Sequence, residues 1–75
     1  MYQDKGVVTE DLGGFFRRAR EMAGLTQEQL AKKIGTCVSV VHRIENNKYN
    51  PTIAFLDRYA KGLGVKVEIR FWLTP

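Results

Sequence analysis

The sequence predicts a small all-α helical bundle followed by one C-terminal β-strand, and three observations support this prediction. Apolar side chains recur at spacings of three and four residues in four separate segments, as they do along helices with one buried face. Gly or Asn follows each segment, and both residues are common where helices end. After residue 64 the apolar period changes to two, which is typical of a half-buried strand.

Length and composition indicate one folded domain with a small core. The chain has 75 residues, of which 44% are hydrophobic and 27% are charged. Twelve Lys and Arg against eight Asp and Glu give a net charge of +4, which favours a polyanionic partner. The single Cys37 cannot form an internal disulfide, and no apolar run is long enough to span a membrane. We therefore expect a cytoplasmic protein without a membrane partner.

The first two helices are predicted from their ends and their apolar faces. Thr9 is the expected cap of the first helix, which stops at Gly24. Thr26 opens the second helix, because Thr followed three residues later by Gln29 is a capping box. Gly35 closes it, since glycine readily adopts the left-handed conformation. The apolar faces consist of Leu12, Phe15, Phe16, Ala19, Met22 and Ala23 in the first helix, and of Leu30, Ala31 and Ile34 in the second.

Two further helices are expected after the turn at residues 35–36. The third extends from Cys37 to Glu45 and ends at residues 46–47, two Asn that tolerate the left-handed conformation. Thr52 is the expected cap of the fourth helix, and Gly64 follows its last turn. The apolar stripes consist of Val38, Val41 and Ile44 in the third helix, and of Ile53, Leu56, Tyr59, Ala60 and Leu63 in the fourth.

The expected strand needs a partner for its backbone amides and carbonyls. Within the chain, the one candidate is the arm around residues 6–9. The economical partner is the same strand of a second copy, antiparallel about a two-fold axis. The chain then divides into a flexible arm at 1–8, a helical domain at 9–64 and a dimerisation strand at 65–75. The expected dimer interface consists of Val67, Ile69, Phe71, Trp72 and Leu73.

The second and third helices, with Gly35 between them, match a helix-turn-helix. This unit binds DNA for a dimensional reason, since an α-helix fits the major groove and its outer side chains reach the base edges. A helical bundle without DNA-binding function can show the same short helices ending at Gly. Spacing alone therefore leaves open whether this unit is a helix-turn-helix or part of such a bundle.

A family resemblance favours DNA binding. Residues 24–31 (GLTQEQLA), 34–35 (IG), 43–46 (RIEN) and 63–65 (LGV) resemble the Cro/CI repressor family, also called the Xre family. The similarity covers residues 12–65 and implies a lambda-repressor-like domain that binds double-stranded DNA. The strand after residue 65 resembles that of family members that are antitoxins of bacterial toxin-antitoxin operons. This second resemblance implies a homodimer that represses its own operon at a palindromic operator and also binds a toxin.

The resemblance also implies roles for individual residues. Gln27, at the start of the second helix, contacts a phosphate. Arg20 and Glu45 match a buried ion pair between the first and third helices. The other DNA contacts are Val38 at a thymine methyl or sugar, Ser39, His42 and Arg43 at base edges, and Asn46, Lys48, Tyr49 and Asn50 at the DNA backbone.

Two positions depart from the family pattern. Cys37 stands where the family usually has a Ser or Thr cap, so we expect a cap from Thr36 or none. Val38 stands where the family usually has Gln, Arg or Lys, which leaves fewer polar groups to recognise bases. The sequence therefore does not predict the operator.

Other functional classes remain as alternatives. We expect no enzyme, cofactor or metal site, because one His, one Cys and scattered acidic residues form no catalytic set. Arg17 and Arg18 are expected to form a solvated face of the first helix. The alternatives to an antitoxin are a phage-type or stand-alone regulator without a toxin, and a protein-interaction module that does not bind DNA.

Overall fold

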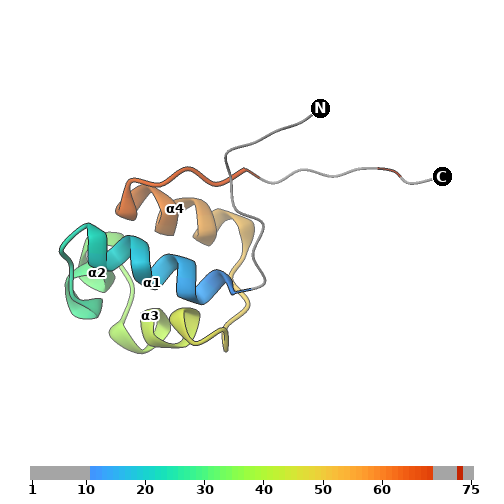
Figure 1. Ribbon diagram of the computed structural model, residues 1–75. Helices are drawn as coiled ribbons and strands as arrows, with labels where there is room; N and C mark the ends of the chain where they lie inside the picture. The colour runs from blue at the N-terminus through green and yellow to red at the C-terminus, as the bar shows by residue number, and fades with distance from the viewer. Residues whose placement is uncertain (1–10, 69–72, 74–75) are drawn as a thin grey trace.

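Four α-helices pack around one apolar core in the residues that the structure describes, which are 11–68 and 73. They are α1 (Leu12–Met22), α2 (Gln27–Ile34), α3 (Val38–Glu45) and α4 (Ile53–Leu63). In this computed structural model, α2 packs against α3 and α4, and α1 packs against α3. Figure 1 places α4 and α3 on opposite sides of α1, with α2 at one end. The predicted helical bundle is confirmed.

The core is built from one or more side chains of every helix. Phe16, Leu30, Val41 and Tyr59 are fully buried, and the rings of Phe16 and Tyr59 have centroids 4.8 Å apart, which joins α1 to α4. Complete burial of an apolar side chain of this size stabilises a fold by about 1.5–3 kcal/mol. The remaining core residues are Ala31, Ile34, Ile44 and Leu63, with Phe15, Ala19, Leu25, Val40, Phe55, Leu56 and Val65 packed around them.

The helix ends show which predicted caps form. Thr26 Oγ1 accepts a hydrogen bond from the Gln29 amide at 3.0 Å, and Gln29 Oε1 accepts one from the Thr26 amide at 2.9 Å, which confirms the capping box. Thr52 Oγ1 accepts from the Phe55 amide, as predicted for α4. The prediction for α1 is wrong, because Asp11 caps that helix, accepting from the amide of residue 14 at 2.8 Å.

Three predicted apolar faces were too broad. In α1, Met22 is 88% exposed and Leu12 is also exposed, because the buried face of this helix centres on Phe16. In α3, Val38 is exposed, whereas Val40 is half-buried against the core. In α4, Ile53 was predicted on the apolar side but is 62% exposed, because it stands at the first turn of the helix. Helical periodicity identifies the buried side of a helix, but how far along the helix burial extends depends on where its neighbours cross it.

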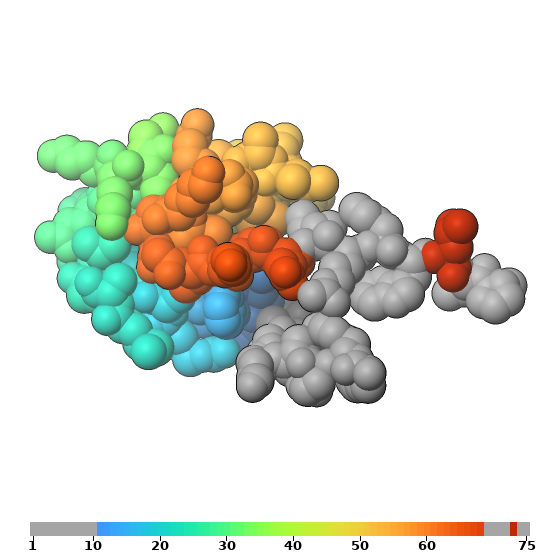
Figure 2. All heavy atoms as spheres, turned by 90° about the horizontal axis from the view of Figure 1, so that it is seen from above, coloured from blue at the N-terminus to red at the C-terminus, as the bar shows by residue number. Residues whose placement is uncertain are grey.

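The expected C-terminal strand is absent from the part of it that the structure describes. Val65 packs against the core, and its amide donates to the Ala60 carbonyl oxygen at 3.0 Å. Residues 65–68 and 73 form no strand, since the described part of this single chain offers their backbone no pairing partner. Figure 2 looks onto this side of the molecule and shows residues 65–68 lying along its surface. The arm at 1–8 and the interface residues Ile69, Phe71 and Trp72 lie outside the described residues.

Candidate nucleic-acid interface

The turn between α2 and α3 fixes the direction in which α3 leaves it. Gly35 has φ 76° and ψ 40°, the left-handed conformation that ends helices. The Thr36 amide donates to the Ala31 carbonyl oxygen at 2.8 Å, so the turn also satisfies a carbonyl in the last turn of α2. Two helices of eight residues therefore meet across one glycine turn, which is the helix-turn-helix arrangement.

The helix α3 has one buried and one exposed face. Val41 and Ile44 are buried in the core, which anchors α3 from below. The outer face carries a hydroxyl, an imidazole and a guanidinium, groups that can hydrogen-bond base edges in a major groove. These exposed side chains are Ser39, His42 and Arg43.

The residues after α3 are hydrogen-bonded back onto its last turn. Asn46 Nδ2 donates to the His42 carbonyl oxygen at 2.8 Å and lies 3.4 Å from His42 Nε2. The Lys48 amide donates to the Arg43 carbonyl oxygen, also at 2.8 Å. The side chains expected to contact the DNA backbone from this segment are all exposed; they are Asn46, Lys48, Tyr49 and Asn50.

A buried ion pair joins α1 to α3. Arg20 Nε lies 2.6 Å from Glu45 Oε2, and Arg20 Nη2 lies 3.2 Å from Glu45 Oε1. Arg20 Nη1 also donates to the Leu25 carbonyl oxygen at 2.7 Å. The hydrogen bond to the Glu45 carboxylate raises the pKa of Arg20 above its ordinary value. The pair that the family resemblance implied is thus present, at the end of α3 opposite to its turn with α2.

Gln27 is hydrogen-bonded to the Glu45 carboxylate of the same ion pair. Its Nε2 donates to Glu45 Oε1 at 2.9 Å, and the side chain is half-buried between α2 and α3. A glutamine amide has two N–H donors, so one donor of Gln27 stays available at the start of α2. The expected phosphate contact of Gln27 stays a prediction, and the structure adds a scaffold role that sequence spacing did not indicate.

A second polar contact, which was not predicted, joins the start of α1 to the turn that follows α3. Asn47 has φ 59°, and its Nδ2 donates to Asp11 Oδ1 at 2.9 Å. Asn47 Oδ1 accepts from the Gly13 amide, also at 2.9 Å. The left-handed tendency of Asn is visible in the sequence, but a bond between residues 36 positions apart has no local signal.

Comparisons with known proteins agree with this geometry. The family model described as "Helix-turn-helix" matches residues 16–69. The chain belongs to this Xre-type helix-turn-helix family. An uncharacterized HTH-type transcriptional regulator from Methanocaldococcus jannaschii is 43% identical over 49 residues, covering 65% of this chain and 74% of that protein.

Two further relatives have names that describe a role. The structure of SinR, a master regulator for biofilm formation, in complex with DNA has a TM-score of 0.69 and 32% identity; the match covers 73% of this chain and 89% of that chain. The immunity repressor of Bacillus phage phi105 is 35% identical over 57 residues, which cover 76% of this chain and 40% of that protein. The homologues of this helix-turn-helix protein thus include transcriptional regulators and a repressor.

The first turn of α3 lacks a side-chain cap. Cys37 is the exposed N-cap residue and makes no capping hydrogen bond to the α3 amides, so the expectation that a cap is missing holds for Cys37. Its Sγ lies 3.2 Å from Ser39 Oγ, and this hydroxyl lowers the pKa of the Cys37 thiol below its ordinary value.

Residues 11–68 contain neither a metal-binding cluster nor a membrane-spanning helix. No group of three or more His, Cys, Asp or Glu in this range is placed to hold a metal ion. None of the helices described is long and apolar enough to cross a membrane.

Proposed function

We propose that this helix-turn-helix protein is a sequence-specific DNA-binding transcriptional repressor, and that α3 is its reading helix. The observation that carries the proposal is the outward projection of Ser39, His42 and Arg43 from a helix whose opposite face is buried. A guanidinium can form two parallel hydrogen bonds with guanine, so Arg43 is the strongest candidate for base recognition. The exposed Val38 would contact a thymine methyl or a sugar.

Backbone contacts on both sides of α3 would supply most of the affinity. Gln27 at the start of α2 would contact one phosphate, and the phosphates beyond the end of α3 would be contacted by Asn46, Lys48, Tyr49 and Asn50, all of which are exposed. Each phosphate neutralised by a cationic side chain releases counterions, so binding would weaken steeply with added salt.

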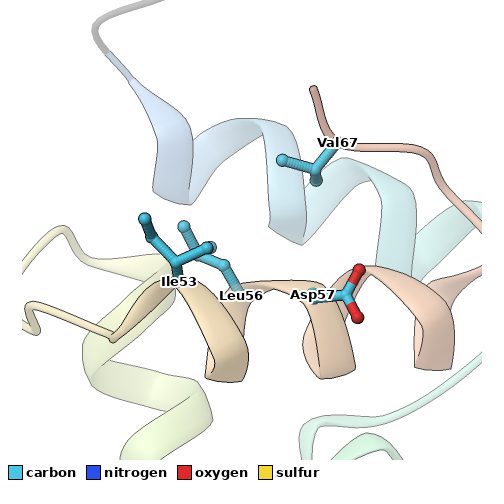
Figure 3. A pocket seen from close by; sticks show the side chains of 4 residues that line it. All are labelled: Ile53, Leu56, Asp57 and Val67. Carbon is cyan, nitrogen blue, oxygen red and sulfur yellow. The ribbon is translucent and has the colours of Figure 1, made fainter. Parts of the chain in front are cut away.

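We further propose a homodimer that leaves α3 free. The side of α4 opposite to α3 carries a hollow of about 230 Å³ lined by Ile53, Leu56, Asp57 and Val67. Figure 3 shows the first three projecting from α4 toward the segment that carries Val67. Ile53 is 62% exposed, and such an apolar surface favours a partner. A second copy here would allow the C-terminal segments, with Ile69, Phe71, Trp72 and Leu73, to pair across the two-fold axis.

This dimer would bind a palindromic operator. Two reading helices about 34 Å apart would enter successive major grooves on one face of the duplex. Repression would follow by occlusion of polymerase, which agrees with the name of the phage phi105 relative, an immunity repressor.

Selection from random-sequence DNA tests the proposed function. We expect the wild-type protein to enrich a palindromic duplex and to lose affinity as salt is raised. On that duplex, Arg43→Ala should weaken binding by about 1–3 kcal/mol and relax preference at one base pair, whereas Lys48→Ala should weaken binding to all sequences alike. Failure to enrich any sequence, with no salt-sensitive binding, would instead favour the protein-interaction module.

The dimer has a separate test. Ile69→Pro removes a backbone donor from the proposed strand pair, so we expect sedimentation equilibrium to show a weaker dimer than in the wild type. A dimer of unchanged strength would contradict strand pairing.

The antitoxin role is a narrower proposal that depends only on the resemblance of the C-terminal residues. It predicts a toxin gene beside the gene for this chain and a stable complex of the two purified products. A neighbouring gene set without such a partner would favour a stand-alone or phage-type regulator.

A further inference from the structure

Arg43 lies at one end of a row of side chains that contact one another. Its Cζ is 6.0 Å from the centroid of the Tyr49 ring. The Tyr49 ring lies 6.3 Å from that of Phe55, with the two planes at 58°. Phe55 in turn contacts the fully buried Tyr59, at 6.1 Å between centroids. A continuous set of ring contacts therefore extends from the hydrophobic core to the guanidinium of Arg43.

The backbone holds Tyr49 beside Arg43 as well. The Lys48 amide donates to the carbonyl oxygen of Arg43 at 2.8 Å, so the residue before Tyr49 is hydrogen-bonded to Arg43 itself. Asn47 adopts φ 59° and turns the chain back at this point. The position of the Tyr49 ring is thus restrained from the backbone side and, through Phe55, from the core side.

The chemistry of this contact suits a base-reading side chain. A guanidinium that stacks on an aromatic ring keeps its in-plane N–H donors free for a bidentate acceptor. In the described residues, Arg43 makes no hydrogen bond or ion pair, unlike Arg20, whose donors bind Glu45 and Leu25. Holding Arg43 in few conformations also lowers the entropy lost when it binds.

We infer that Tyr49, supported by Phe55, is a positioning residue that orients Arg43 for base recognition and so contributes to sequence specificity. This inference depends on the proposed function and deepens it. The Tyr49 ring acts through Arg43, whereas its hydroxyl is the group available for a phosphate. These two roles are separable by mutation.

The test uses the duplex that the wild-type protein selects and compares Tyr49→Leu with Tyr49→Phe. Tyr49→Phe keeps the ring and removes the hydroxyl, so it is the reference for the ring alone. We expect Tyr49→Leu to bind about two- to fivefold more weakly than Tyr49→Phe. We also expect it to lose preference at the same base pair that Arg43→Ala identifies. In an Arg43→Ala background, the two Tyr49 variants should bind equally.

Two further variants test whether Phe55 supports the Tyr49 ring and whether the effect is specific to the Arg43 contact. Phe55→Leu should reduce the same base preference, because it removes the ring that Tyr49 packs against. Arg58→Ala is the matched control, since Arg58 Cζ lies 5.0 Å from the Phe55 ring centroid and its removal leaves the Arg43 contact intact. The control should keep the wild-type base preference. Circular dichroism checks that each variant is folded; Tyr49 is 37% exposed, so its replacement leaves the core unchanged.

Equal affinity and equal base preference of the two Tyr49 variants would overturn the inference. An undiminished difference between them in the Arg43→Ala background would also overturn it, because the ring would then contact DNA directly. In both cases the wild-type protein still selects its duplex and the proposed function stands. A wild-type protein that selects no duplex overturns both.

Discussion

At the scale of single residues, α3 lacks a side-chain cap at its N-terminus. A helix N-cap is normally a side chain whose oxygen accepts a hydrogen bond from a free amide of the first turn. Cys37 occupies that position with the right extended backbone, at φ −103° and ψ 158°, but its side chain makes no such bond. The backbone at Cys37 therefore has the conformation of an N-cap, but the thiol does not accept a hydrogen bond from the first turn of α3.

Restoring the cap should stabilise the protein. We expect Cys37→Ser to raise the free energy of unfolding by about 0.5–1 kcal/mol, because the serine hydroxyl is a better acceptor than a thiol. Urea unfolding followed by circular dichroism measures the change. Cys37→Ala is the control and should bring no gain; an equal gain from Ala would show that the effect is not capping.

The second feature at this scale is the hydroxyl of Tyr59. It is buried and has no hydrogen-bond partner among the described residues, and burial raises the pKa of this phenol well above its ordinary range. Tyr59→Phe removes the unsatisfied group and keeps the ring, so we expect about 1 kcal/mol of added stability. Tyr49→Phe, at an exposed ring, should leave the unfolding free energy unchanged. A loss of stability in Tyr59→Phe would mean that the hydroxyl is satisfied in solution.

At the scale of elements, the close approach of α1 to the end of α3 depends on a glycine. A Cβ on Gly13 would lie 2.5 Å from the carbonyl oxygens of Ile44 and Glu45, which are backbone atoms. Such an approach was not predictable from helix propensity, by which Gly13 only weakens α1. The same crossing places Asn47 and Asp11 within hydrogen-bond distance.

Gly13→Ala tests this packing. Helix propensity alone favours Ala by about 1 kcal/mol, but the steric conflict with α3 should make the variant less stable by about 1–3 kcal/mol. Gly14→Ala is the matched comparison, because the three atoms nearest to its Cβ all belong to the Asp11 side chain, so the conflict can be relieved by moving that side chain at the cost of the α1 cap and the Asn47 contact. Its loss should be the smaller of the two in thermal unfolding; a greater loss would contradict the proposed crossing.

The contact of Asp11 with Asn47 also predicts a pH dependence. The Asn47 amide, followed by the backbone amide of Gly14, lowers the pKa of Asp11 below its ordinary value of 3.8. A carboxyl whose folded-state pKa is depressed stabilises the fold above its unfolded-state pKa, and this contribution is lost as pH falls through the lower value. Asp11→Asn should therefore unfold more easily than the wild type at pH 7.

The difference between Asp11→Asn and the wild type should shrink from about pH 5 to about pH 2, where the wild-type carboxyl becomes protonated. Urea unfolding of both proteins across this range is the measurement. A difference that does not vary with pH would show that charge at Asp11 is unimportant and that only its hydrogen-bond geometry matters.

The elements themselves were largely predictable, because their signals are local. Thr26 with Gln29, Gly35, Thr52 and Gly64 each act within a few residues, and the helix ends follow them. The Asp11 cap was missed because Thr9 offered an equally plausible oxygen nearby. For the C-terminal segment, a period of two described the side-chain pattern, but strand formation requires a partner backbone, and the described residues of one chain offer none.

At the scale of the whole molecule, the sequence predicted which side chains of α3 face outward. It did not predict the contacts that α3 makes with residues of other elements. Ser39 and His42 follow from the same period that buries Val41. The contacts of Gln27 with Glu45 and of Tyr49 with Arg43 join different elements, so no local pattern encodes them. The hollow lined by Ile53, Leu56, Asp57 and Val67 appears only once the helices are packed.

We propose that α3 and its flanking residues form the surface that contacts DNA. Titration of the isotopically labelled protein with its selected duplex, followed by amide chemical shifts in NMR, tests it most directly. We predict the largest shifts at residues 38–39, 42–43 and 46–50 and at the start of α2, with little change around Ile53 and Asp57. Large shifts confined to the α4 hollow, with α3 unchanged, would contradict the account.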